Sequence, residues 1–124
     1  MPFELRVEPG ELLARVRGWG KDDFASTAEA LRRLGEDPRL RPGMPVLMDV
    51  RDLDYVATPP EVAAFASPES MPALFAGHRV AIVARRGTQF GVAKTFADKS
   101  ERAGSETEVF AEPELALEWL RGTR

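Results

Sequence analysis

Few side chains in this sequence could carry out chemistry. The absence of cysteine excludes disulfides, thiolate metal sites and cysteine nucleophiles, and the single histidine, His78, excludes multi-histidine metal sites. No serine or carboxylate stands at a recognisable triad spacing from His78, which we interpret as a surface residue. Asp49, Asp52 and Asp54 could ligate magnesium only if they converged, and we interpret them as loop carboxylates. The sequence therefore predicts a protein that is not an enzyme and carries no metal or cofactor.

One glycine-containing stretch begins like a dinucleotide-binding fingerprint. Residues 18–23 lie between a predicted strand and a predicted helix, but Asp23 occupies the place of the third glycine. A carboxylate there would repel a pyrophosphate at the start of the helix. We therefore interpret residues 18–20 as a flexible loop in which Trp19 packs on the edge of a sheet.

A second stretch, residues 87–95, partly matches a phosphate-binding loop. That loop needs a lysine directly after its second glycine, whereas two residues separate Lys94 from the glycine here. What remains is a candidate anion site, formed by Arg85, Arg86 and the backbone amides near Thr88 at a helix N-terminus. The alternative is that two solvated arginines end a strand.

Length and composition predict one domain covering residues 1–124. Hydrophobic residues make up 44% of the chain and charged residues 30%, which is typical of a globular protein. With 20 acidic and 17 basic residues the formal charge is −3, so we expect no nucleic-acid partner. No apolar stretch reaches the roughly 20 residues that cross a bilayer, and the N-terminus lacks the features of a signal peptide. We expect a cytoplasmic protein.

Apolar runs predict five strands. Residues 3–7 alternate apolar and polar side chains, and residues 12–17 follow the turn signal Pro9-Gly10 as the second strand of a hairpin. Two short apolar runs predict strands that are buried on both faces, and a third run predicts a short last strand. These three runs are residues 46–50, 79–84 and 108–110.

Helix caps and apolar spacing predict helices between these strands. The first helix is capped by Asp22 or Asp23. The second begins at Thr58 with a capping box and is broken into two pieces by Pro68 and Pro72.

Two further helices follow, one capped by Thr88 and one covering residues 112–120. The element order ββαβαβαβα predicts an α/β fold, a two-layer sandwich with a mixed sheet of about five strands and most helices on one face. Four residues of the last helix are expected to face the core, namely Leu115, Ala116, Trp119 and Leu120.

Several core segments together resemble the SpoIIAA-like branch of the STAS domains, a branch also likened to the CRAL-TRIO lipid-binding fold. The resemblance covers most of the chain and implies a STAS-like fold. The segments that carry it are residues 46–51, 80–83, 96–98, 108–110 and 114–120.

The resemblance implies a non-enzymatic regulatory module that binds a protein partner. In anti-sigma-factor antagonists of this type, a kinase-like partner phosphorylates a serine in the motif Asp-Ser-Ser-Gly. The corresponding stretch here is residues 57–60, in which only Thr58 could carry the phosphate. Pro59 and Pro60 remove two amides that would hold a phosphate, and Glu61 adds a negative charge. We therefore expect Thr58 to be a structural cap and the phosphoserine switch to be lost.

Two functional hypotheses follow. The first is an interaction module whose partner, another protein or a second copy in a homodimer, binds a surface formed by Trp19, Tyr55, Val56 and Thr58. The alternative is a carrier of a small apolar or anionic ligand in a pocket under residues 62–75. The residues expected to bind that ligand are Phe65, Phe75, Arg85, Arg86 and Thr88.

Overall fold

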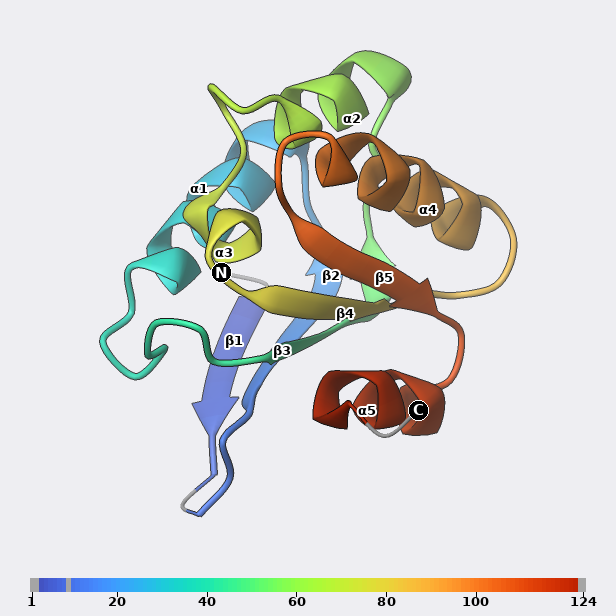
Figure 1. Cartoon of the computed structure of the whole chain (residues 1–124). Helices are drawn as coiled ribbons and strands as arrows, with labels where there is room; N and C mark the ends of the chain where they lie inside the picture. The colour runs from blue at the N-terminus through green and yellow to red at the C-terminus, as the bar shows by residue number, and fades with distance from the viewer. Residues whose placement is uncertain (1–2, 9, 123–124) are drawn as a thin grey trace.

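One mixed sheet of five strands runs through the computed structural model, which describes residues 3–8 and 10–122 (Figure 1). In order across the sheet the strands are β1 (Phe3–Val7), β2 (Ala14–Lys21), β3 (Val46–Asp54), β4 (Arg79–Val83) and β5 (Glu106–Phe110). β1 is antiparallel to β2, and each later pair of neighbours is parallel. The predicted mixed sheet is confirmed, while Pro9 of the predicted turn lies outside the described residues.

Helices cover the two faces of the sheet unequally (Figure 1). Within the described part of the chain they are α1 (Phe24–Gly35), α2 (Pro59–Ala66), α3 (Ala73–Ala76), α4 (Thr88–Glu101) and α5 (Pro113–Arg121). The first four lie over one face, where they enclose the larger hydrophobic core, and α5 packs on the other. The break between α2 and α3 confirms the effect predicted for Pro68 and Pro72.

The strands β2 and β3 are longer than the sequence predicts. Trp19 pairs with Asp52 and Lys21 with Asp54, beyond a register shift between Arg17 and Trp19. Asp49 also lies within β3, so the predictions of a loop at residues 18–20 and of loop carboxylates at Asp49, Asp52 and Asp54 are wrong. Pairing with β2 supplies hydrogen-bond partners for the backbone N–H and C=O groups around Asp52 and Asp54. This outweighs the weak strand propensity of aspartate.

Gly18 permits close packing between β1 and β2. It lies opposite Phe3 in the antiparallel ladder, and a Cβ atom at Gly18 would come within 2.8 Å of the Phe3 ring. The ring is buried because the space beside Gly18 is free for it. The φ angle of Gly18 is not positive, so backbone freedom does not explain the glycine. Its small volume does.

The caps of two helices settle two predictions. Asp23 caps α1, and its carboxylate accepts a 2.8 Å hydrogen bond from the Ser26 amide, which confirms one of the two candidate caps. Thr88 is wrong as a cap, because it is the first residue of α4 and the capping position belongs to Gly87. Gly87 has a φ of +97°, which favours glycine over threonine there.

The last helix buries a narrower stripe than predicted. Ala116 and Leu120 are buried on the sheet, and Trp119 packs partly against the same cluster. Leu115 is 50% exposed, so its predicted core position is wrong. The spacing of four residues between Ala116 and Leu120 sets the buried face of α5, and Leu115 lies about 100° around the helix from Ala116.

Candidate ligand-binding cavity

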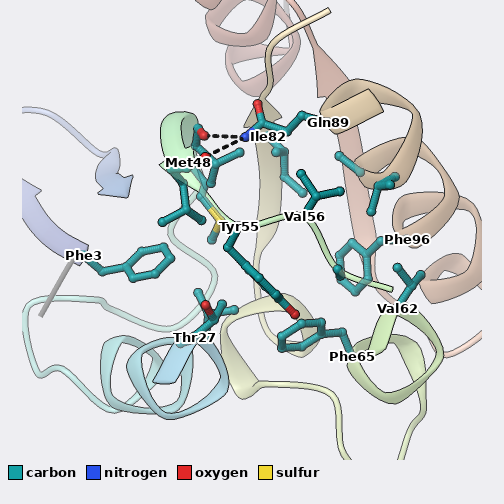
Figure 2. Close-up of a pocket in the computed structure, with 16 residues that line it drawn as sticks. Phe3, Thr27, Met48, Tyr55, Val56, Val62, Phe65, Ile82, Gln89 and Phe96 are labelled. Carbon is teal, nitrogen blue, oxygen red and sulfur yellow. Dashed lines mark hydrogen bonds between the residues drawn. The ribbon is translucent and has the colours of Figure 1, made fainter. Parts of the chain in front are cut away.

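A cavity of about 120 Å³ lies between the larger helical layer and the sheet (Figure 2). Met48, Val50 and Leu53 of β3 and Ile82 of β4 form its floor. Met48 and Ile82 are direct neighbours in the parallel ladder, so their side chains lie on the same face. Leu53 and Ile82 lie near the carboxyl ends of β3 and β4, so part of the cavity lies toward the edge where open α/β sheets commonly bind ligands.

The helices supply the walls. On α4 the lining residues recur at helical spacing, which places them in one stripe facing the sheet. That stripe consists of Gln89, Val92, Ala93 and Phe96. Val62 and Phe65 of α2 form the next wall, and Thr27 and Leu31 of α1 complete it. Three helices must therefore be in place before the cavity exists.

The connector between β3 and α2, residues 55–58, crosses the cavity. Its Tyr55, Val56 and Ala57 all line the space. Figure 2 shows the Tyr55 side chain extending toward Phe65, with Phe3 and Thr27 on one side of it and Val62 and Phe96 on the other. The Tyr55 side chain therefore lies between lining residues of α1 and β1 on one side and of α2 and α4 on the other.

A single carboxylate oxygen ties this connector to α2. Oε1 of Glu61 accepts hydrogen bonds from the Tyr55 hydroxyl at 2.9 Å and from the Thr58 amide at 3.0 Å. Hydrogen bonds from the Thr58 amide and then from the Tyr55 hydroxyl hold the pKa of the Glu61 carboxyl below its ordinary value. Burial, followed by the Glu61 hydrogen bond and charge, raises the pKa of the Tyr55 phenol. The phenol is therefore neutral and acts as the donor.

The remaining polar side chains of the wall also have protein partners. The Thr27 hydroxyl donates to Asp22 at 2.6 Å. The amide nitrogen of Gln89 donates to the carbonyl oxygens of Val50 at 2.8 Å and Leu53 at 3.4 Å, as Figure 2 shows. The Gln89 side-chain oxygen accepts from the backbone amide of Arg85 at 2.6 Å. The hydroxyl and amide donors of this wall are therefore already used, and most of the exposed lining is hydrocarbon.

The structure brings three of the predicted site residues together at this cavity. Tyr55 and Val56, predicted for a partner surface, and Phe65, predicted for a ligand pocket, all line it. Thr58 lies at the end of the connector as the cap of α2. Phe75 is instead in the core, its ring centroid 4.7 Å from that of Phe96 in an edge-on contact.

The other predicted site residues lie apart from the cavity lining. Trp19 is half-buried in β2, with the Arg17 guanidinium 5.0 Å from its ring centroid. Thr88 is exposed at the first position of α4. Arg86 forms a 2.8 Å ion pair with Glu112.

Arg85, the other arginine of the predicted anion site, is turned toward β3. Its guanidinium donates to the carbonyl oxygens of Arg51 and Leu53. The two arginines thus have different protein partners and do not converge on one point.

Gln89 is one of several residues of this site that were not predicted from the sequence, together with Thr27 and Glu61. It is 7% exposed and joins the ends of β3 and β4 to the first turn of α4. The available signal was its spacing of three, four and seven residues from three apolar residues of the same helix, which places a polar side chain on an inward-facing stripe. Those three residues are Val92, Ala93 and Phe96.

The single histidine and the aspartates of β3 have local partners. Nδ1 of His78 is 2.8 Å from the Met44 carbonyl oxygen, at the amino end of β4 and away from the cavity. Asp49 pairs with Arg51 at 2.7 Å. Among residues 3–8 and 10–122, no group of three or more His, Cys, Asp or Glu side chains could hold a metal ion. In the same residues, no helix has the length and hydrophobicity to span a bilayer.

Comparisons with known proteins identify the fold. Neither the protein-family models nor the curated proteins give a match. A solved structure from Shewanella loihica PV-4, an uncharacterised protein of the DUF3478 family with a SpoIIAA-like fold, superposes with a TM-score of 0.56 at 15% sequence identity. The alignment covers 95% of this chain and 91% of that one. The β1–β5 sheet with its unequal helical layers is therefore a SpoIIAA-like fold.

Proposed function

We propose that this protein binds a small apolar molecule in the cavity between β3, β4 and the helices α1, α2 and α4, without carrying out chemistry on it. The observation that carries the proposal is a cavity of about 120 Å³ whose polar side chains are already hydrogen-bonded to the protein. An apolar cavity of this volume has room for a group the size of a benzene ring. Water does not compete well for the space, because it would find few hydrogen-bond partners there.

The size of the cavity limits the ligand. An aromatic ring or a short alkyl chain fits, and each CH₂ group removed from water contributes about 0.8 kcal/mol to binding. A long acyl chain would require the connector, residues 55–58, to move away from α2. The proposal is therefore for a compact apolar group.

Toluene is a suitable first probe. A ligand that binds only the folded state raises its stability, by about 1.4 kcal/mol when its concentration is ten times Kd. We expect toluene to raise the melting temperature by a few degrees in a concentration-dependent way. No rise up to the solubility limit of toluene would contradict the proposal.

A matched pair of substitutions locates the binding. Ala93→Leu places a larger side chain in the cavity from α4, while Ala63→Leu adds the same atoms on the exposed face of α2. We expect Ala93→Leu to fold and to lose the toluene response, and Ala63→Leu to retain it. Equal responses from the two variants would show that toluene binds elsewhere.

A second candidate function is a protein-interaction module, which the exposed part of the connector favours. Val56 is 38% exposed and Thr58 is exposed two residues later. We propose that this surface contacts a second copy of the chain. Sedimentation velocity at rising concentration would then show a dimer that Val56→Asp dissociates and Leu115→Asp, at an exposed leucine of α5, leaves intact. A monomer at every concentration would rule out the homodimer.

A further inference from the structure

We propose that the cavity selects an apolar molecule whose polar end donates hydrogen bonds, an amine or an alcohol, over one that ends in a carboxylate. The inference rests on the proposed function and assigns the chemical class of the ligand. It follows from the hydrogen-bonding and the charges of the residues that surround Tyr55.

Hydrogen-bond capacity is the first argument. The hydroxyl donors of Tyr55 and Thr27 are directed to Glu61 and Asp22, and both N–H groups of Gln89 are directed to backbone carbonyls. What the lining residues Tyr55 and Thr27 still offer is acceptor capacity, in the remaining lone pairs of their hydroxyl oxygens. A ligand that donates finds partners there, whereas a carboxylate only accepts.

Charge is the second argument. Glu61 lies 2.9 Å from the Tyr55 hydroxyl, and Asp22 and Asp23 stand at the start of α1 beside Thr27. The charges of these three acids contribute to the raised pKa of the Tyr55 phenol, so their negative potential reaches this part of the wall. A ligand carboxylate beside Tyr55 would be repelled by it, and an ammonium group would be attracted.

The nearby cations do not reverse this balance. Arg85 donates to two carbonyl oxygens near the end of β3, on the Gln89 side of the cavity. Lys21 lies at the end of β2, next to Asp22 and paired in register with Asp54. Both cations therefore stand beside protein acceptors, and the charges that shift the pKa of the Tyr55 phenol are those of the three acids.

Three probes with the same six-carbon chain test the inference. Hexylamine, hexanol and hexanoate differ only in the polar end, and at pH 7 they are positive, neutral and negative. Calorimetric titration should give hexylamine and hexanol comparable affinities, with hexanoate at least about tenfold weaker. The wild-type protein is used throughout as the reference.

A charge-neutral variant tests the role of Glu61. Glu61→Gln keeps an oxygen that accepts from Tyr55 and Thr58 but removes the negative charge. We expect this variant to bind hexylamine about three- to tenfold more weakly than the wild type does. Its affinity for hexanol should be unchanged, and its affinity for hexanoate should increase. Glu101→Gln removes the same charge from the exposed C-terminal residue of α4 and should leave all three affinities unchanged.

The outcomes separate this inference from the proposed function. Binding of hexanoate as tight as that of hexylamine would overturn the selectivity and leave an apolar binding cavity standing. If Glu61→Gln and Glu101→Gln weaken hexylamine equally, the selectivity comes from net charge and the role of Glu61 is wrong. If none of the probes binds and toluene also has no effect, the proposed function fails together with the inference.

Discussion

The Tyr55 hydroxyl and the Thr58 amide donate to the same oxygen of Glu61, at 2.9 Å and 3.0 Å. Glu61 is the third residue of α2, so this oxygen joins both ends of the connector, residues 55–58, to the first turn of that helix. Pro59 and Pro60 fill the first two positions of α2 and fix its backbone. The connector is thus attached to the fold at the point where it forms part of the cavity wall.

Removal of the Tyr55 hydroxyl should loosen the connector. Tyr55→Phe keeps the ring in the wall and removes its hydrogen bond to Glu61, at a cost of about 1 kcal/mol in the free energy of unfolding. We expect hydrogen exchange to accelerate at the amides of Val56 and Ala57 more than elsewhere. Thr95→Val removes an exposed hydroxyl bond to the Gly91 carbonyl and serves as the control. Unchanged exchange in the connector would mean that side-chain packing alone holds it.

Acid should weaken the attachment at Glu61. The folded-state pKa of this carboxyl lies below its ordinary value of 4.5, because the Thr58 amide and the Tyr55 hydroxyl hydrogen-bond to it. A depressed pKa contributes stability that is fully present above about pH 4.5 and is lost as the pH falls through the folded-state value. The difference in unfolding free energy between wild type and Glu61→Gln should therefore be constant from about pH 7 to 5 and shrink below 4.5. A difference that grows in acid would contradict this assignment.

The regular parts of the fold were predictable because local sequence and tertiary context agree there. The apolar residues 80–83 are buried in β4, and Thr58 caps a helix as its capping-box sequence predicts. The second half of β3 was not predictable from local signals. Asp52 and Asp54 are poor strand residues, and only the ladder with β2 explains why they are extended.

The cavity could be predicted only in part. Phe65 was assigned to a pocket and lines one, but Tyr55 and Val56 were assigned to a separate surface. Periodicity shows which side of an element is buried and gives no information on where the packed side chains leave space. Gln89 illustrates the limit, since its partners are carbonyl groups of a strand more than 30 residues earlier in the chain.

Loss of the Gln89 side-chain amide should destabilise the junction of β3 with α4. In Gln89→Leu the new side chain is similar in size, but the Val50 carbonyl and the Arg85 amide lose this partner. We expect the free energy of unfolding to fall by about 2–3 kcal/mol. Urea unfolding gives this value directly. Lys99→Leu, an exposed substitution on the same helix, should change stability by less than about 0.5 kcal/mol. A cost for Gln89→Leu below about 0.5 kcal/mol would show that water replaces the lost amide.

Two Gly→Ala substitutions should change stability in opposite directions. At Gly18 the new Cβ would lie 2.8 Å from the Phe3 ring, so Gly18→Ala forces a buried aromatic side chain to move and should cost about 1–3 kcal/mol. At Gly91, inside α4, nothing lies within 4 Å, and Gly91→Ala should stabilise by about 0.5–1 kcal/mol because alanine loses less entropy in a helix. Combining Gly18→Ala with Phe3→Leu should recover part of the loss if the ring contact is its cause. A double variant whose destabilisation equals the sum of the single ones would place the strain in the backbone of β2 instead.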